Sequence, residues 1–290
     1  MDRIVVGVDA GAAGVAAMQW ALTEAVRWGV PLSAVRAWSP SVYGNDYSGV
    51  LTSRDGQPAE RTDAQQLADE QLTMACARVP GSDTVVCSGT ATGGGPAQVL
   101  LDASGPGVLL VVGTRGHGVL SRAVMGSVSS SVLHHVHGPV VAVPEPAPRD
   151  NRPGRVVVGV DHSPASLAAL AVGAEHARRR NAVLVPVYVQ QPILGDMPGL
   201  GAGFQDLAAL EAVERRSLEL TCQEIGSQGA APVEAEVIVG HAGSTLTALT
   251  RPQDLLVVGS RGRGGFAALL LGSTSTQCVQ HATCPVLVVR

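Results

Sequence analysis

The chain repeats itself over nearly its whole length. The segment RIVVGVDAGAAG, which begins at Arg3, has a counterpart in RVVVGVDHSPAS, which begins at Arg155. A second pair of matching segments runs from Val-Val-Gly to Gly-Ser, at 111–127 and 257–273. Two copies of about 140 residues each have the size of ordinary single domains. The repeat predicts two domains of one fold, at 1–145 and 154–290, with a proline-containing, charged linker at 146–153.

Each copy alternates apolar runs with helical stretches. Strands are predicted at 3–8, 32–38, 84–89, 108–113 and 139–143, and at 155–160, 182–189, 235–240, 254–259 and 285–289. Helices are predicted at 13–28, 60–78, 96–103 and from Ser127, and at 164–180, 204–226, 243–250 and from Ser273. Strands that are apolar throughout are typical of a parallel sheet covered on both faces. Right-handed crossovers then predict a doubly wound α/β sheet in each domain.

The composition excludes several classes of function. The chain contains no lysine, so a Walker P-loop and a Schiff-base lysine are excluded. A net charge of −4 argues against nucleic-acid binding. No apolar run reaches the length of a membrane span, and no secretory signal is evident, so we expect a cytoplasmic protein. Five cysteines without a CxxC pair predict reduced thiols, and the histidines of LHHVHG do not predict a metal site.

A glycine spacing occurs in both copies directly after the fourth predicted strand. One glycine ends the strand, a second follows three residues later, and a Gly-Ser pair lies ten residues beyond it. The residues are Gly113, Gly116, Gly126 and Ser127 in the first copy and Gly259, Gly262, Gly272 and Ser273 in the second. Glycines let the backbone approach a ligand, and a helix that opens at the serine presents free N–H groups to an anion. The spacing predicts one phosphate site in each domain.

Side chains around this spacing leave two interpretations open. Arg115 and Arg261 either reach phosphate oxygens or point to solvent. Asp9 and Asp161, which end the first strand of each copy, either cap the following helix or bind a ribose or base. These two roles are compatible. The serine of each Gly-Ser pair acts either as a helix N-cap or as a direct hydroxyl donor.

Both copies resemble the ATP-binding branch of the universal stress protein family, whose signature is G-2x-G-9x-G-S/T. The GVD at the end of the first strand and the closing PVxVV strand also match, so the resemblance covers nearly the whole chain. The tandem arrangement is similar to that of actinobacterial members.

The resemblance implies five-stranded parallel sheets of the adenine nucleotide α-hydrolase type, with strand order 3-2-1-4-5 and ATP, with or without Mg²⁺, between the loops after strands one and four. It implies adenine or ribose contacts for strand-end residues and phosphate contacts for the serine-containing segments. The implied strand-end residues are Gly7, Val8, Asp9, Ala37 and Val112, and Gly159, Val160, Asp161, Val189 and Val258. The implied phosphate-binding segments are Ser127-Val128-Ser129 and Ser273-Thr274-Ser275.

The first copy departs from the family pattern more than the second does. It lacks two hydroxyls after the first aspartate, has a smaller side chain in the adenine pocket and lacks an acidic residue before the fourth strand. The differing positions are Gly11 against Ser163, Gly14 against Ser166, Ala37 against Val189, and Gly107-Val108 against Asp254. We therefore expect weaker ATP binding in the first domain.

The resemblance favours an ATP-binding stress or dormancy regulator that is read by a protein partner. A slow ATPase or nucleotide-modifying enzyme is the alternative, although no residue is predicted to be catalytic. A scaffold with empty sites is a third possibility. Pairing of the last strands, Val140–Val143 and Val286–Val289, within one chain or in a homodimer is also implied by the resemblance.

Overall fold

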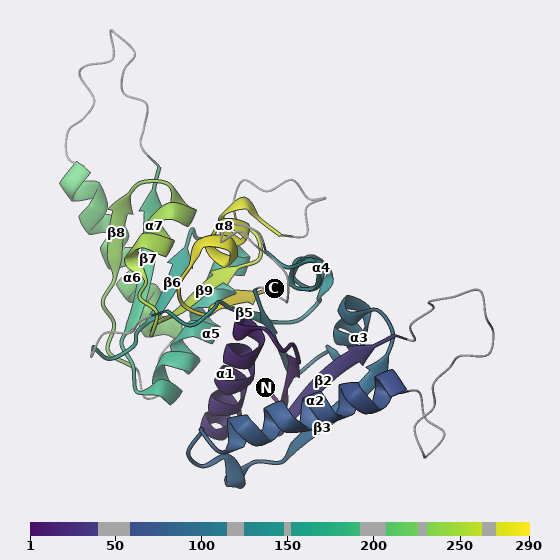
Figure 1. Cartoon of the computed structure of the whole chain (residues 1–290). Helices are drawn as coiled ribbons and strands as arrows, with labels where there is room; N and C mark the ends of the chain where they lie inside the picture. The colour runs from purple at the N-terminus through teal and green to yellow at the C-terminus, as the bar shows by residue number, and fades with distance from the viewer. Residues whose placement is uncertain (40–58, 115–124, 148–151, 192–206, 226–230, 263–270) are drawn as a thin grey trace. The chain divides into compact units, whose positions relative to one another are not determined.

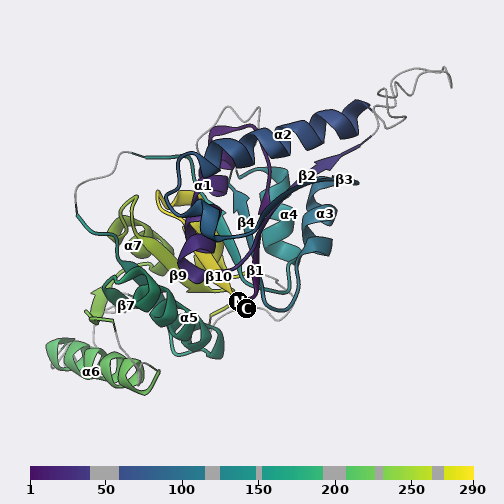
Figure 2. The ribbon, with the colours of Figure 1, turned by 90° about the horizontal axis from the view of Figure 1, so that it is seen from below.

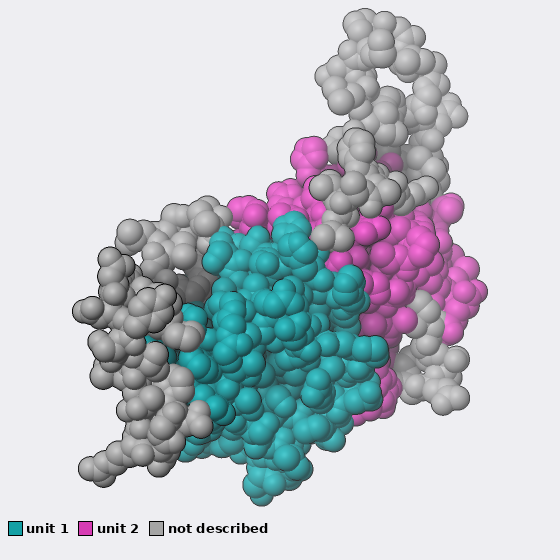
Figure 3. All heavy atoms as spheres, turned by 90° about the vertical axis from the view of Figure 1, so that its right-hand side faces the viewer, with its two compact units in different colours: residues 1–146 teal, residues 147–290 magenta. Residues whose placement is uncertain are grey.

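The structure, a computed structural model, describes residues 1–39, 59–114, 125–147, 152–191, 207–225, 231–262 and 271–290. The chain splits into two compact units, Met1–Pro146 and Ala147–Arg290 (Figure 3). In both units strands alternate with helices along the chain (Figure 1).

The first unit is a parallel α/β sheet with strand order β3-β2-β1-β4-β5. Its elements are β1 (Arg3–Gly7), α1 (Ala12–Trp28), β2 (Leu32–Trp38), α2 (Ala59–Cys76), the short 3₁₀ helix η1 (Ser82–Thr84), β3 (Cys87–Gly93), α3 (Pro96–Ala103), β4 (Val108–Gly113), α4 (Ser127–His135) and β5 (Val140–Val143).

The second unit repeats this topology, with strand order β8-β7-β6-β9-β10. Its elements are β6 (Val156–Val160), α5 (Pro164–Arg180), β7 (Leu184–Gln190), α6 (Leu207–Ile225), β8 (Glu236–Val239), α7 (Ala242–Leu249), β9 (Leu255–Gly259), α8 (Ser273–His281) and β10 (Val286–Val289). The predicted doubly wound parallel fold and its strand order are confirmed in both units.

The core of each unit lies between its sheet and the helices on both faces. In the first unit α1 and α2 pack on one face and α3 and α4 on the other; α5 with α6 and α7 with α8 do the same in the second (Figure 2). Strands β1 and β6 are buried because helices cover both sides of them. None of the described helices is long and apolar enough to cross a membrane.

The third strand of the first unit begins later than predicted. We expected it at 84–89, but residues Ser82–Thr84 form η1 and the strand begins at Cys87. Gly81 precedes η1 with a φ of 77°, and its carbonyl accepts the N–H of Thr84 at 3.0 Å. The β-branched residues Thr84, Val85 and Val86 favoured a strand in the sequence, but Thr84 belongs to η1 and the strand begins only after Val86.

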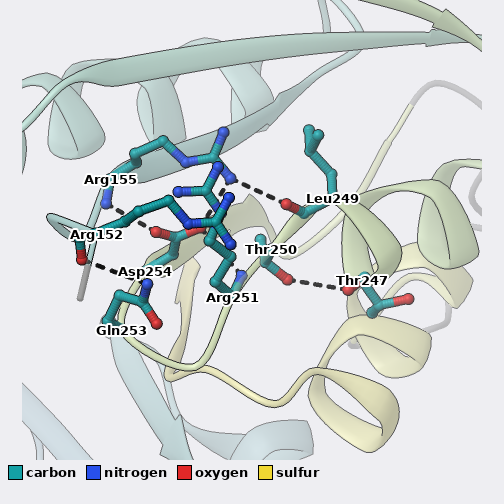
Figure 4. Close-up of polar contacts among 8 residues, drawn as sticks. All are labelled: Arg152, Arg155, Thr247, Leu249, Thr250, Arg251, Gln253 and Asp254. Atoms are coloured by element: carbon teal, nitrogen blue, oxygen red, sulfur yellow. Dashed lines mark hydrogen bonds and ion pairs between the residues drawn. The ribbon is translucent and has the colours of Figure 1, made fainter. Parts of the chain in front are cut away.

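Asp254 lies at the end of the second sheet where β9 begins, whereas the motif glycine Gly259 lies at the other end of that strand. Its side chain is completely buried. It accepts the backbone N–H of Arg155 at 2.8 Å, the Arg155 guanidinium at 2.9 Å and the backbone N–H of Arg251 at 3.1 Å (Figure 4). A second guanidinium bond from Arg155 reaches the carbonyl of Leu249 at 3.0 Å.

This position corrects one argument made from the sequence. The absence of an aspartate before the fourth strand of the first copy cannot weaken nucleotide binding directly, because Asp254 is not among the residues around the crevice at the far end of β9. Asp254 instead joins the start of β6 to the turn before β9 through a buried ion pair with Arg155.

Replacing Asp254 with alanine is expected to lower the free energy of unfolding of the second unit by about 3 kcal/mol, because the Arg155 side chain, which is only 13% exposed, loses its counter-charge. Urea denaturation followed by circular dichroism measures the loss. Glu219→Ala is the control, since its ion pair with Arg216 is exposed and its removal should cost no more than about 1 kcal/mol. Equal costs for the two variants would contradict the role given to Asp254.

Candidate functional site

Each unit has a crevice at the carboxyl ends of its first and fourth strands. Such ends, where strand order reverses, are the usual ligand sites of open parallel sheets. The first crevice is lined by Gly7, Val8, Asp9, Val35, Arg36, Ala37, Pro96, Leu100, Val112, Gly113, Gly126, Ser127, Val128 and Ser129. The second is lined by Gly159, Val160, Asp161, Ser166, Val187, Tyr188, Val189, Gln191, Ala242, Leu246, Val258, Gly259, Arg261, Gly262, Gly272, Ser273, Thr274 and Ser275.

The structure thus brings together every described residue that the sequence proposed for a site. Arg115 and Gly116 lie outside the described residues. Sequence reasoning missed the apolar floor of each crevice, which comes from the third helix of each unit. Leu100 and Leu246 lie on that floor, and their only sequence signal is their equivalent helical position.

The first motif glycine of each unit is required by close packing of the backbone. A Cβ at Gly113 would lie 2.8 Å from the carbonyl carbon of Ala13, and a Cβ at Gly259 would lie 2.8 Å from that of Ala165. Real Cβ atoms do not approach backbone atoms so closely, so any side chain would force the strand away from the helix that follows β1 or β6. The missing side chain therefore brings the first and fourth loops together.

The serine segment of each motif opens a helix toward the crevice. In the first unit Gly126 is the N-cap of α4, so the prediction that Ser127 caps the helix is wrong. The same holds for Gly272 and Ser273 in α8. The extended φ and ψ of both glycines suit the N-cap position, and this leaves the hydroxyls of the two serines, which are exposed, as possible donors.

The second serine of each segment has a structural bond. The buried hydroxyl of Ser129 donates to the carbonyl of Gly113 at 2.6 Å, and that of Ser275 donates to the carbonyl of Gly259 at 2.7 Å. These bonds hold the helix end against the strand end. The first-turn N–H groups of α4 and α8 have no acceptor within their own helices, as is usual for the first turn of a helix. With the helix dipole, they form a site for an anion.

The aspartate at the end of the first strand orders the loop that follows it. One carboxylate oxygen of Asp9 accepts the N–H of Gly11 at 3.2 Å, and Asp161 accepts that of Ser163 at 3.0 Å. Neither aspartate is the helix N-cap, because Gly11 and Ser163 occupy that position. The interpretation of the two aspartates as helix caps is therefore wrong. Each aspartate instead forms a short turn, in which its carboxylate accepts the N–H of the residue two positions later.

The second motif glycine of the second unit lies against this aspartate. A Cβ at Gly262 would be 2.5 Å from Oδ2 of Asp161. The carboxylate and the glycine backbone thus border the same end of the crevice, and the glycine makes room for the acid.

Comparison with known proteins decides the family. The universal stress protein family matches residues 1–144 and again residues 153–290. The chain belongs to the universal stress protein family. A universal stress protein of Mycolicibacterium smegmatis is 33% identical over 99% of this chain and 96% of its own. One from Mycobacterium tuberculosis is 31% identical over 99% of this chain and 94% of its own. The crystal structure of a universal stress protein from Archaeoglobus fulgidus aligns with a TM-score of 0.69 at 19% identity, covering 99% of this chain and 98% of that one.

The two universal stress protein domains place different side chains in their crevices at one equivalent position of their second strands. Arg36 lines the first crevice, and its guanidinium donates to the carbonyl of Val8 at 2.8 Å. Tyr188 takes the equivalent place in the second crevice, where its ring lies 5.6 Å from that of His162. His162 in turn contacts Glu214 on α6. The first crevice has a volume of about 350 Å³ and the second about 620 Å³.

Arginine side chains add positive charge beside the motif of the second domain. Arg261 lines the crevice and is exposed. Burial, and then the charge of Arg261, lowers the pKa of Arg290, so the two guanidinium groups lie close enough to repel. Among the described residues, no group of three or more His, Cys, Asp or Glu is arranged to hold a metal ion.

Gly113→Ala is expected to lower the free energy of unfolding of the first unit by about 1–3 kcal/mol, because the new Cβ meets the Ala13 backbone. Urea denaturation followed by tryptophan fluorescence reports this unit alone, since the three tryptophans of the chain are Trp20, Trp28 and Trp38. Gly105→Ala is the matched control: no heavy atom lies within 4 Å of its Cβ position, so a change below about 0.5 kcal/mol is expected. A Gly113 variant as stable as this control would refute the close-packing argument.

Proposed function

We propose that the protein binds ATP in the crevice of each domain and acts as a nucleotide-dependent stress or dormancy regulator. The observation that carries the proposal is the meeting of an unpartnered helix N-terminus, two glycines and an aspartate at one end of the second crevice. The N–H groups at the helix end can bind phosphates, and the apolar side chains of Val189 and Leu246 can pack against a purine. ATP bound there would change the surface that a protein partner reads.

Binding is favoured over hydrolysis by the residues around the crevices. Each described lining contains one carboxylate, Asp9 or Asp161, and that carboxylate already accepts a backbone N–H. Phosphoryl transfer needs a residue that positions the attacking water and a charge clamp on the leaving phosphate, usually with Mg²⁺. Steady ATP hydrolysis is therefore the result that would count against the proposal. The cytoplasm as the place of action stays a prediction from the sequence, and pairing through the last strands stays a prediction from the resemblance.

Calorimetric titration of the full chain with ATP tests the proposal, together with mass spectrometry of any ligand released from freshly purified, denatured protein. Binding with no steady release of phosphate supports a nucleotide-dependent regulator. The absence of heat and of co-purified nucleotide would reject it. Steady hydrolysis that disappears in the Gly262→Ala variant would replace the regulator with an enzyme.

Gly262→Ala is expected to weaken ATP binding in the second crevice by roughly tenfold or more, because the added Cβ displaces the Asp161 carboxylate. Calorimetry with ATP measures the change. Gln223→Ala, an exposed change on α6 outside the crevice, should leave the affinity as it is. An unchanged affinity in the glycine variant would show that ATP does not use this end of the crevice.

The two crevices are expected to bind ATP unequally, with the first weaker by roughly fivefold or more. The first is smaller and has Ala37 where the second has the larger apolar side chain of Val189. A loss of about 1 kcal/mol of apolar contact with the bound nucleotide is enough for this difference.

Tryptophan fluorescence separates the two crevices in the full chain, because all three tryptophans lie in the first domain. The fluorescence titration should saturate at higher ATP concentration than the tighter step seen by calorimetry. In Gly262→Ala the tighter step should weaken while the fluorescence curve stays in place. A fluorescence midpoint at or below that of the tighter step would contradict the prediction.

A further inference from the structure

Two free cysteines of the first unit lie where α2 meets the edge strand β3. Cys76 is the last residue of α2, and Cys87 is the first residue of β3. Both side chains are half-buried and neither is in a disulfide. The crevice described above involves neither residue.

The packing of α2 along β3 brings Cys87 toward the helix. Further along the same strand, the side chain of Gln65 accepts the N–H of Ala91 at 2.9 Å and donates to the carbonyl of Gly89 at 3.0 Å. A Cβ at Gly89 would lie 3.5 Å from Cβ of Ala68. Because alternate residues of a strand share a face, Cys87 continues this helix-facing row. The row therefore leads from the middle of α2 to its last turn, where Cys76 lies.

The two thiols lie close to each other. Burial, then the charge of Cys76 and a side-chain hydrogen bond between the two thiols, raises the pKa of Cys87 to about 11. The hydroxyl of Ser82 donates to the carbonyl of Cys76 at 2.9 Å, which holds the connecting turn against the end of the helix. A side-chain hydrogen bond requires the two sulfur atoms to be close, which is one of the conditions for a disulfide between them.

The second unit lacks this pair. Val233 pairs with Leu184 as Cys87 pairs with Leu32, so valine stands where the first unit has its strand cysteine. Cys222 on α6 is buried, and its pKa is raised to about 11 by burial and by the charge of Glu219. The pair is a property of the first unit and not of the shared fold.

We propose that Cys76 and Cys87 are a thiol modification site that hydrogen peroxide converts into a reversible disulfide between α2 and β3. The Cys76 thiolate attacks one peroxide oxygen; the O–O bond breaks, hydroxide leaves and Cys76 becomes a sulfenic acid. The sulfur of Cys87 then attacks that of Cys76, the S–S bond forms, the S–O bond breaks, and water leaves with the thiol proton. Peroxide is reduced by the two electrons that the dithiol loses.

The order of the two steps follows from the surroundings of Cys87. A thiol with a pKa of about 11 stays protonated at neutral pH, so the first oxidation falls on Cys76. Once Cys76 is a neutral sulfenic acid, its charge no longer raises the pKa of Cys87, and the second step becomes easier. The charge of Cys284 also raises the pKa of Cys278, but both thiols are completely buried, which protects them from peroxide.

The bond would tie down the helix that supports the first crevice. Five residues before Cys76, the side chain of Gln71 donates to the carbonyl of Asp9 at 2.9 Å. The disulfide therefore adds a covalent anchor to the same helix that holds the loop after β1. This inference stands whether or not the crevice binds ATP.

Peptide mapping of the full chain tests the proposal. The reduced protein is treated with a small excess of hydrogen peroxide, free thiols are blocked with N-ethylmaleimide, and the protein is digested with trypsin without reductant. Cleavage after Arg61, Arg78 and Arg115 places the two cysteines in separate peptides, 62–78 and 79–115. The expected result is a linked pair of these peptides, lighter by two hydrogen atoms than their sum, that dithiothreitol separates.

Cys76→Ser and Cys87→Ser should each lose the linked pair, and the matched control Cys222→Ser should keep it. Mixing ¹⁵N-labelled and unlabelled chains before oxidation distinguishes a bond within one chain from a bond between chains. Linked peptides that combine both labels would overturn the proposal. So would oxidation of either cysteine to sulfinic acid with no linked pair at any peroxide concentration.

Discussion

The site in each domain depends on one close approach of two backbones. The fourth strand ends at a glycine whose missing side chain lets it touch the start of the helix after the first strand. At Gly113 and Gly259 a Cβ would fall 2.8 Å from a backbone carbon, so neither position has room for one. This contact sets the two loops side by side. The serine bonds of Ser129 and Ser275 then fix the following helix so that its free N–H groups face the crevice.

A shared backbone has allowed the two domains to acquire different side chains around that contact. Arg36 brings a cation to the first crevice, where it also binds the carbonyl of Val8. Tyr188 brings an aromatic ring to the second, next to His162 and its partner Glu214. The strand order is the same in both units, although the two residues differ. Both lie near the carboxyl end of the second strand of their unit, where the side chains line the crevice. Duplication thus preserves the fold while the chemistry of each crevice can diverge.

The proposed cysteine pair is a second case in which the two units share a fold but differ in their side chains. Cys76 and Cys87 lie outside the crevice, on a helix–strand contact that both units possess, yet the second unit has valine at the strand position. In a reducing compartment such a disulfide would be transient and would report oxidising conditions. Its place on α2 connects it to the loop of Asp9 through Gln71.

The repeat, the β-branched runs and the glycine spacing of the sequence predicted the fold, its strand order through the family resemblance, and the residues that line each crevice. These features depend on local periodicity and on backbone room, which a single sequence displays. The sequence misplaced Asp254, whose buried pair with Arg155 lies at the opposite end of the sheet from the crevice. The cap interpretations made from the sequence were also wrong. They named residues one or two positions away from the N-caps in the structure, which are Gly11, Gly126, Ser163 and Gly272. Only the tertiary structure placed Arg36 and Tyr188 in the crevices and Cys76 beside Cys87. Those juxtapositions join residues from different strands and helices, and packing, rather than any local pattern, decides which side chains meet.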